Sequence, residues 1–217
     1  MSAQHNNVSF LDWGRTSYDE AMAKQEEKLH QRIRNECPDT VIFTEHDPVY
    51  TLGVRPGAEK HLLSDAENSG SNIIPLVKTN RGGDITYHGP GQIMAYAVFH
   101  LREKDLHLFL RNLEEVLIRT VGYLGLAAAR RPGKTGIWMG DRKLAAIGIG
   151  VRKWVTFHGF ALNLNPDLSP FCGIVPCGIT DGTVTSIEKE LGFAPPRTEV
   201  MTLLEHVFTE VFFPKNP

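Results

Sequence analysis

The sequence predicts an α/β or α+β fold in which long helices pack against a central sheet. Short apolar segments of strand character gather in the middle of the chain, and two amphipathic stretches, 104–123 and 200–211, lie outside them. This order favours a sheet that is buried by helices. With 217 residues, 41% of them hydrophobic, the chain is long enough for one large domain. We expect a single domain over residues 1–217, with the polar stretch Ser64–Asn72 as an excursion within it.

The first half of the chain is predicted to begin with a helix. Ser17 and Glu20 have the spacing of a capping box, and the helix that they open runs to about Asn35. Pro75 confines its own segment to the edge of a sheet. The segment 92–99 is apolar almost throughout, as expected of a strand covered on both faces. The strands predicted in this half are 41–44, 50–53, 73–77 and 92–99.

The second half is predicted to contain three helices and a group of strands. Apolar residues at helical spacing predict a helix over 104–123 and another over 200–211. A short helix begins in Thr185–Glu188 and stops at Gly192. Gly140 and Asp141 are predicted to form a two-residue hairpin turn between the strands 136–139 and 143–151. The strands predicted in this half are 136–139, 143–151 and 155–164.

Composition excludes several classes of protein. Lys and Arg number 23 against 25 Asp and Glu, so the basic excess of a nucleic-acid binder is missing. The longest apolar run, Ile93–Phe99, is too short to span a membrane, and no secretory signal is visible. Three cysteines are too few for a disulfide framework. We therefore expect a cytoplasmic protein that binds neither nucleic acid nor membrane, and a monomer because no interface stripe is visible.

The glycine-rich segment Arg81–Gln92 is the first candidate for a binding site. Four glycines and one proline fall within eleven residues, which allows the backbone to approach a ligand closely. Interleaved Arg, Thr, Tyr and His supply side-chain donors at the same place. No Gly-Lys-Ser/Thr follows, so the segment is not a phosphate-binding P-loop. A tight structural turn is the alternative interpretation.

Lys143 and Cys177 are candidates for chemistry. The small apolar segment Ala145–Gly148 after Lys143 can line a pocket and withdraw an amine from water. A solvated charge at a strand edge is the alternative. Cys177 lies between proline and glycine, which leave its sulfur accessible. A nucleophilic thiolate needs a nearby cation, and Lys143 is suitable if the fold brings it close.

The remaining cysteines and the histidines give weaker signals. Cys37 and Cys172 are interpreted as inert packing residues. The spacing between Cys172 and Cys177 is not that of a zinc-ligand pair, and the histidines lack metal-ligand spacing, so no metal is expected. His46 and His158 are interpreted as loop or strand-end residues with a structural or pocket role.

Five segments together resemble a known family. They occur in sequence order as EHDPVYTLG at 45–53, RGGDITYHGPGQ at 81–92, RKLAAIGIGV at 142–151, FHGFALN at 157–163 and LSPFCGIVPCGI at 168–179. The combination is closely similar to the bacterial octanoyltransferase family, also called lipoate-protein ligase B. The resemblance implies an α/β domain around a mixed sheet flanked by helices, like the catalytic domains of biotin and lipoate protein ligases.

The resemblance also implies a reaction. The family transfers an octanoyl group from acyl carrier protein to a lysine of a lipoyl domain, the first step of endogenous protein lipoylation. Its acceptors are the lipoyl domains of 2-oxoacid dehydrogenase E2 subunits and the glycine cleavage H protein. Transfer from a thioester to an amine is downhill, so neither ATP nor another cofactor is expected.

The family's functional residues map onto this sequence one by one. Its acyl-accepting cysteine falls on Cys177, and the lysine that lowers the pKa of that thiol falls on Lys143. Arg81 is in addition a candidate for attracting an acidic carrier surface. The expected substrate-binding residues are Arg81, Gly82, Gly83, Asp84, Ile85, Thr86, Tyr87, His88, Ala146, Ile147, Gly148, Gly159, Phe160 and Ala161.

Other functions stay open at this point. An ATP-dependent lipoate or biotin ligase would share the fold but needs no nucleophilic cysteine. A thiol hydrolase would use Cys177 with His88 or His158 and release free acid. A binding module would hold the carrier without turnover. Within the transferase hypothesis, Lys143 and His88 are both candidates for the base that accepts the proton of the incoming amine.

Overall fold

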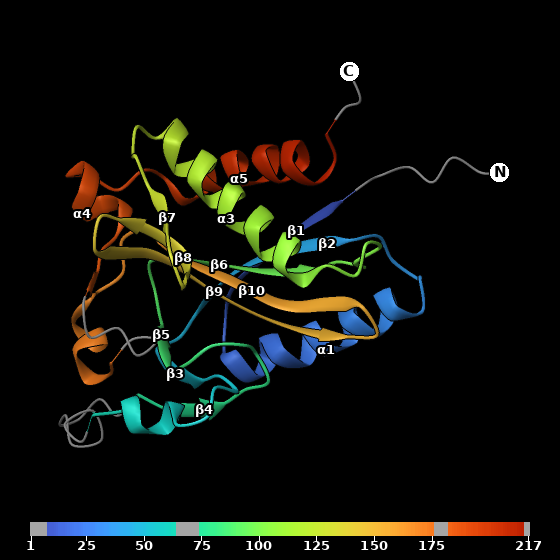
Figure 1. Ribbon diagram of the computed structural model, residues 1–217, viewed down its shortest axis with the longest axis horizontal. Coiled ribbons are helices and arrows are strands. Elements are labelled where there is room, and N and C mark those ends of the chain that lie inside the picture. Colours follow the sequence, from blue (N-terminus) through green and yellow to red (C-terminus); the bar gives the residue numbers. More distant parts are fainter. Residues whose placement is uncertain (1–7, 64–73, 176–181, 215–217) are drawn as a thin grey trace.

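The computed structural model contains a large mixed sheet that lies between helices (Figure 1). It describes residues 8–63, 74–175 and 182–214. The strand order is β1-β2-β6-β10-β9-β8-β7, and β11 pairs with β9. The β1–β2 and β11–β9 pairs are parallel and the others antiparallel, so the mixed sheet is confirmed. Its strands are β1 (Ser9–Thr16), β2 (Thr40–His46), β6 (Gln92–Val98), β7 (Ala129–Arg131), β8 (Lys134–Met139), β9 (Arg142–Arg152), β10 (Val155–Asn163) and β11 (Thr183–Val184).

A small sheet of order β4-β3-β5 accompanies the large one on the side of α1 (Figure 1). Its strands are β3 (Val49–Leu52), β4 (Leu76–Lys78) and β5 (Thr86–His88). The α-helices are α1 (Tyr18–Ile33), α3 (Leu106–Tyr123), α4 (Ile187–Leu191) and α5 (Arg197–Phe212). Short 3₁₀ helices form at Ala58–His61 and Ser169–Gly173.

The large sheet carries one hydrophobic cluster on each of its two faces, because side chains point alternately to the two faces along each strand. On β2, Val41 and Phe43 belong to the cluster that packs beneath α3 and α5, and Ile42 belongs to the cluster beneath α1. Side chains of a strand point alternately to its two faces, so a strand covered on both sides must be apolar throughout. This explains β6, all seven residues of which are buried. Figure 1 shows α3 and α5 on one side of the sheet and α1 on the other.

Most of the predicted elements are confirmed. Ser17 caps α1 by accepting the N–H of Glu20, and β4 lies at a sheet edge directly after Pro75. The hairpin at Gly140 joins β8 to β9 as expected. The N-cap of α4 is Ser186, whose side chain accepts the N–H of Lys189.

Four strands were not predicted, and each has a local reason; one of them, β11, has only two residues. β1 mixes polar and apolar residues and has an irregular register at 12–15. β5 is concealed inside the glycine-rich segment, and the exposed β7 is only three residues long. The predicted excursion Ser64–Asn72 lies outside the described residues.

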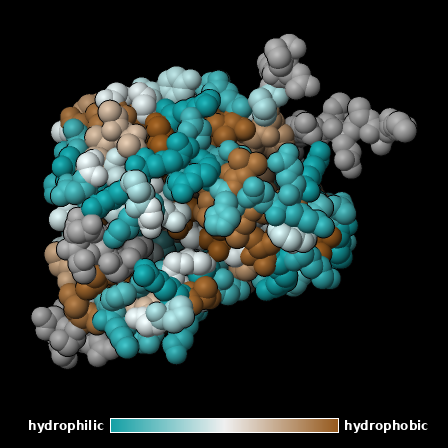
Figure 2. Space-filling view, in the orientation of Figure 1, coloured by the Kyte–Doolittle hydropathy of each residue, from teal (hydrophilic) through white to brown (hydrophobic). Residues whose placement is uncertain are grey.

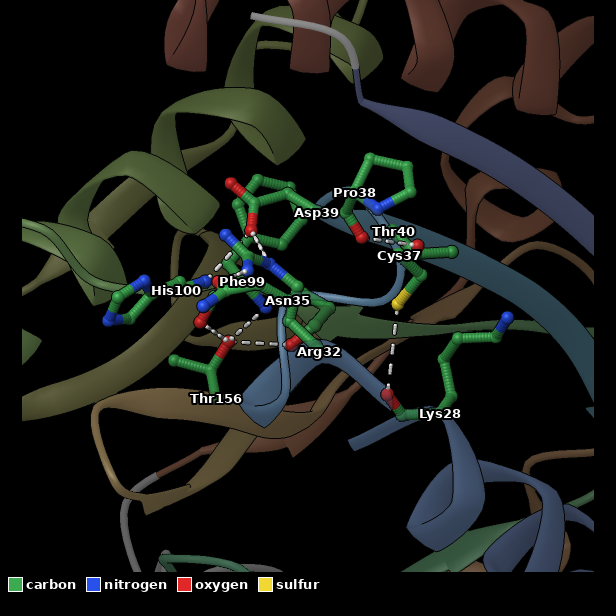
Figure 3. Close-up of polar contacts among 11 residues, drawn as sticks. Lys28, Arg32, Asn35, Cys37, Pro38, Asp39, Thr40, Phe99, His100 and Thr156 are labelled. Atoms are coloured by element: carbon green, nitrogen blue, oxygen red, sulfur yellow. Dashed lines mark hydrogen bonds and ion pairs between the residues drawn. The ribbon is translucent and has the colours of Figure 1, made fainter. Parts of the chain in front are cut away.

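A polar network fastens the C-terminal end of α1 to the large sheet (Figure 3). The carboxylate of Asp39 accepts the Arg32 Nε–H at 2.7 Å and the backbone N–H of His100 at 2.9 Å. Arg32 also donates to the side chain of Asn35 at 2.7 Å. A nearly buried ion pair of this kind is held by the hydrogen bonds around it. The network therefore fixes α1 over the sheet, with Tyr18 at the opposite end of the helix.

The surface is mixed in character. On the face shown in Figure 2, hydrophilic residues predominate, and hydrophobic residues gather in patches across the middle. In the part of the chain that the structure describes, no helix is long and apolar enough to cross a membrane.

Candidate active site

A pocket lies between the α1 side of the large sheet and the small sheet, and small residues form its floor. Gly148 pairs with Gly159, and Ala146 pairs with Ala161, on the neighbouring strands β9 and β10. A Cβ atom on Gly159 would overlap a main-chain carbonyl of β6, and one on Gly148 would lie 2.6 Å from the carbonyl oxygen of Gly82. Close packing of backbones therefore requires glycine at these two positions, which leaves the floor open.

Arg81 holds the glycine-rich loop over this floor. Its Nη2 donates to the carbonyl oxygens of Thr51 and Asp84 at 2.7 Å each, and its Nη1 donates to the carbonyl oxygen of Gly82 at 3.1 Å. The Gly82 N–H in turn donates to the carbonyl oxygen of Ile149 on β9 at 2.9 Å. The loop is thus tied to both sheets. Because Arg81 is only 8% exposed and bonded to the loop itself, the expectation that it attracts an acidic carrier surface is wrong.

Tyr96 and His46 form a hydrogen-bonded pair at the inner end of the pocket. The Nδ1 of His46 lies 3.1 Å from the carbonyl oxygen of Thr16, which can only accept, so Nδ1 carries the proton. Nε2 therefore accepts the Tyr96 hydroxyl at 2.5 Å. Burial lowers the pKa of His46 and raises that of Tyr96 well above its usual value. Both side chains are uncharged at neutral pH.

His88 is fixed in the same uncharged state. Arg81 donates through Nε and Nη2 to the Thr51 hydroxyl oxygen, which leaves that hydroxyl to donate to His88 Nε2 at 3.2 Å. Burial lowers the pKa of His88 well below its usual value; the charge of Arg81 and the neighbouring His46 add to this, and the Gln92 side chain opposes it in part. His88 is therefore held as a neutral imidazole.

His158 lies within β10 and lines the pocket. Its expected pocket position is confirmed, but its placement at a strand end is wrong. The backbone adopts φ +59°, and its N–H donates to the Gln25 side chain at 2.6 Å. Nε2 donates to Asn80 Oδ1 at 2.7 Å. Burial, followed by the charge of Arg81, lowers the pKa of His158 to about 3.

The inner part of the pocket is consequently apolar or uncharged. Tyr18, at the first turn of α1, stacks on His88 with ring centroids 6.4 Å apart, and burial raises the pKa of Tyr18 to about 12. Met94 adds an apolar side chain from β6. The space between these side chains measures about 470 Å³, including open solvent. Such a lining suits an aliphatic chain, because no ion has to lose its water there.

Lys143 lies in a second, wider cavity that adjoins the first. Its Nζ lies 5.1 Å from the centre of the Trp138 ring, and the residue is 6% exposed. This cavity measures about 830 Å³, including open solvent, and α3 contributes apolar side chains to it. The residues that line both cavities are Gly83, Asp84, Ile147 and Gly148. The alternative of a solvated edge charge is therefore excluded for Lys143, which lines the cavity that adjoins the first pocket.

Cys177 lies outside the described residues, and only the chain on either side of it can be placed. On one side, the Val175 N–H donates to the carbonyl oxygen of His61 at 2.7 Å. On the other side, Val184 pairs with Lys143 itself, in the parallel pair of β11 and β9. The segment between these two anchors thus ends beside the candidate lysine.

The other two cysteines differ from each other. Cys37 is half-buried, with its sulfur 4.0 Å from the carbonyl oxygen of Lys28 (Figure 3), and burial raises the pKa of its thiol. Cys172 is exposed, so its interpretation as a packing residue is wrong. Among the described side chains, no three His, Cys, Asp or Glu residues gather where they could hold a metal ion.

The structure brings together most of the residues expected to bind substrate. The expected residues that line the first pocket are Arg81, Gly83, Asp84, Thr86, His88, Ala146, Ile147, Gly148, Gly159, Phe160 and Ala161. Gly82 lines the second cavity. Ile85 and Tyr87 instead point into the core of the small sheet, because alternate residues of a strand face opposite sides.

Sequence reasoning missed three residues that line the pocket, Tyr18, Met94 and Tyr96. Tyr18 follows a helix cap, and the other two lie in a strand that is apolar almost throughout, so their local sequence resembles ordinary core. Only the small residues opposite them on β10 could have given a signal.

Comparison with solved structures shows which class of proteins shares this fold. A lipoate-protein ligase A bound with ATP has a TM-score of 0.77 at 19% identity, covering 95% of this chain and 86% of that one. A biotin protein ligase of Aquifex aeolicus has a TM-score of 0.55 at 11% identity, covering 95% and 68%. The fold is therefore that of the lipoate and biotin protein ligase class, as expected.

Sequence comparison is more specific. The family model of the lipoyl protein ligase A/B catalytic domain matches residues 17–209. The octanoyltransferase of Geobacter metallireducens is 45% identical over 87% of this chain and 86% of its own length. That of Syntrophotalea carbinolica is 48% identical over 85% of both chains. The chain belongs to the lipoyl protein ligase A/B catalytic domain family, among its octanoyltransferases.

Proposed function

We propose that this acyltransferase moves an octanoyl group from acyl carrier protein to a lysine of a lipoyl domain through a thioester on Cys177. Octanoyl transfer in protein lipoylation is the activity of its family. The observation that carries the proposed mechanism is the contact between two cavities. A pocket whose inner part is lined by apolar and uncharged side chains opens, past Gly83 and Gly148, into the cavity that contains Lys143.

In the first half-reaction, the Cys177 thiolate attacks the thioester carbonyl of the donor. The new C–S bond forms to Cys177, and the bond to the carrier sulfur breaks. Lys143 stabilises the thiolate as its ammonium and then gives a proton to the departing carrier thiolate. Backbone N–H groups near these two residues would stabilise the oxyanion of the tetrahedral intermediate.

In the second half-reaction, the neutral amine of the lipoyl-domain lysine attacks the acyl-enzyme. The amide bond forms, the C–S bond to Cys177 breaks, and the amine proton passes to Lys143. This returns the thiolate and the ammonium to their starting state. An amide is more stable than a thioester, so the thioester bond of the donor supplies the driving force.

Lys143 is a better candidate than His88 for the base. Nε2 of His88 already accepts a hydrogen bond from Thr51, and its pKa is lowered well below the usual value by burial. A base of this kind holds a proton only weakly at neutral pH. His88 instead fits a role in the pocket wall. The same holds for His158, because burial lowers its pKa to about 3.

The proposed partners follow from the acyl chemistry. The donor is octanoyl-acyl carrier protein, and the acceptors are lipoyl domains of 2-oxoacid dehydrogenase E2 subunits and the glycine cleavage H protein. The first half-reaction requires a free Cys177 thiol, which a reducing cytoplasm preserves. We also propose that residues 1–217 act as one catalytic domain.

Intact-protein mass spectrometry tests this mechanism. The enzyme is mixed with octanoyl-acyl carrier protein without ATP, and the adduct is mapped by peptide digestion. We expect a gain of one octanoyl group at Cys177, which disappears when a lipoyl domain is added. Cys177→Ala should form no adduct, and Cys172→Ala, the matched control at an exposed cysteine, should form it normally.

Three outcomes would overturn the mechanism. An adduct on another residue of the Cys177→Ala enzyme, with transfer at the wild-type rate, would show that Cys177 is not the acyl carrier. Release of free octanoate without any acceptor would indicate a thiol hydrolase. Modification of the lipoyl domain that depends on ATP, with no adduct, would indicate a ligase instead.

A further inference from the structure

The inner end of the acyl pocket is separated from a third cavity by only two side chains. Tyr18 and His158 line the pocket and also line a groove between α1 and the segment that follows β4. The groove measures about 1,020 Å³, including open solvent. Neither residue lines the cavity that contains Lys143. The two side chains therefore close the pocket at a place away from its mouth.

The register of the sheet gives the direction of the pocket. Its mouth lies at Gly148 on β9, which is paired with Gly159 on β10, and Gly159 is paired with Tyr96 on β6. Crossing three neighbouring strands covers about 10 Å, since strands lie about 4.8 Å apart. An extended eight-carbon chain has a similar length. A chain that enters beside Gly148 would reach the rings of Tyr18 and His158 with its methyl end.

His158 is held in this wall by two hydrogen bonds from outside the pocket. Asn80 accepts from its imidazole, and Gln25 accepts from its backbone N–H. Both of these residues line the groove and not the pocket. The φ of +59° is strained for a side chain of this size, so the contacts that hold it offset a real cost. Strain of this kind often marks a position with a function.

Tyr18 is equally restricted. Its ring stacks on His88 and meets the edge of His46, with centroids 6.4 Å and 5.3 Å apart. Beyond the two rings the groove is lined by the apolar side chains of Met22, Val77 and Phe157, together with polar ones such as Asp19, Glu26 and Lys78. The space behind the wall would therefore accept further methylene groups if the wall were opened.

We propose that Tyr18 and His158 form the end wall that limits the length of the transferred acyl chain. This inference rests on the proposed function, because it takes the first pocket as the acyl site. A wall of rigid rings excludes longer chains, which could enter the groove only by displacing one of the rings.

The test compares octanoyl and dodecanoyl donors on the wild-type enzyme and on His158→Gly. Glycine suits a positive φ and removes the ring, so the variant joins the pocket to the groove. We expect the ratio of kcat/KM for the dodecanoyl to that for the octanoyl donor to rise at least about tenfold, because one methylene in an apolar pocket is already worth that much. His206→Asn, at an exposed position on α5, is the control for a changed histidine and should keep the wild-type ratio.

A second variant and a label keep the test decisive. If His158→Gly fails to fold, the same comparison of donors is made on His158→Asn, because asparagine tolerates this φ and is smaller than histidine. An octanoyl group with a photoreactive terminus, loaded on the wild-type enzyme, should label peptides that contain Tyr18 or His158. Labelling of Leu106 or Leu110 in the second cavity would overturn the inference.

The outcomes also separate this inference from the proposed function. Normal octanoyl adducts in both His158 variants, with an unchanged ratio of kcat/KM for the dodecanoyl and octanoyl donors, would disprove the end wall and leave the mechanism intact. Absence of any octanoyl adduct on the wild-type enzyme would remove the proposed mechanism itself.

Discussion

At the residue scale, the burial of Lys143 distinguishes between the two interpretations that its sequence allows, a pocket lysine and a solvated charge at a strand edge. Its ammonium lies against the Trp138 ring at 5.1 Å, and its main chain is paired with Val184. The Lys143 main chain therefore lies beside the strand that follows Cys177 in the sequence. The proposed effect on that thiol is electrostatic, so it should depend on charge and less on side-chain shape.

Lys143→Met should slow the alkylation of Cys177 by iodoacetamide at neutral pH by about tenfold or more. Loss of the cation raises the pKa of the thiol and reduces the thiolate fraction, and one pKa unit corresponds to tenfold. The measurement is the pH profile of the alkylation rate by peptide mass spectrometry. Lys143→Arg should keep most of the rate. A profile of Lys143→Met identical to that of the wild type would contradict the electrostatic role.

His158 gives a prediction about pH and stability. Its pKa is about 3 in the folded protein and about 6.5 when unfolded, so between these values the unfolded state binds more protons. The free energy of unfolding should therefore fall as pH falls below about 6.5, by up to about 1.4 kcal/mol per pH unit for this residue. His46 and His88 act in the same direction.

Urea unfolding at pH 7.5 and pH 5 checks this. The free energy of unfolding of His158→Asn should depend less steeply on pH than that of the wild type. Imidazole nitrogen chemical shifts should also show His158 uncharged at pH 5. An equal slope for both proteins would show that His158 is not protonated on unfolding in this range.

At the element scale, the close approach of β6 and β10 creates the floor of the pocket. Gly159 has no room for a Cβ atom because a β6 carbonyl occupies that place. Neither strand could be recognised as pocket-forming by its periodicity, since both are buried along their whole length. The small residues Gly159 and Ala161 mark the pocket within β10.

Gly159→Ala should lower the free energy of unfolding by about 2–3 kcal/mol, because the added methyl forces the two strands apart. Gly122→Ala is the matched control: it lies in α3 with open space around it, and alanine there should stabilise by up to about 1 kcal/mol. Chemical denaturation of both variants provides the comparison. A Gly159→Ala protein as stable as the wild type would disprove the close approach.

At the scale of the whole molecule, the pocket exists only where the two sheets meet. Its floor belongs to the large sheet, its roof to the loop after β4 and to β5 of the small sheet, and its end to α1. These parts lie far apart in the sequence and side by side in Figure 1. A bound acyl chain would be in contact with all of them.

Formation of the acyl-enzyme should therefore slow amide hydrogen exchange in two distant segments at once. We expect protection to increase over 81–88 and over 146–148, because the chain fills the space between them and reduces local opening. Amides of α3, remote from the pocket floor, should be unchanged. Protection confined to the second cavity would place the acyl chain there instead.

The sequence by itself determined the class of fold, most of the helices and strands, and the family. Helical spacing, capping residues and apolar strands are local signals, and packing reinforced them here, as for α1, α3, α5 and β6. The five ordered motifs carried the assignment to the octanoyltransferases. Motif order also indicated most of the residues that line the pocket.

Only the tertiary structure decided which side of each motif faces the pocket and what closes it. Tyr87 and His88 are neighbours in one strand, yet one is core and the other lines the pocket. Arg81 is a buried clamp and not a surface charge. Tyr18, Met94 and Tyr96 become pocket residues only through strand pairing and helix packing. Such contacts join residues distant in sequence, and no local pattern specifies them.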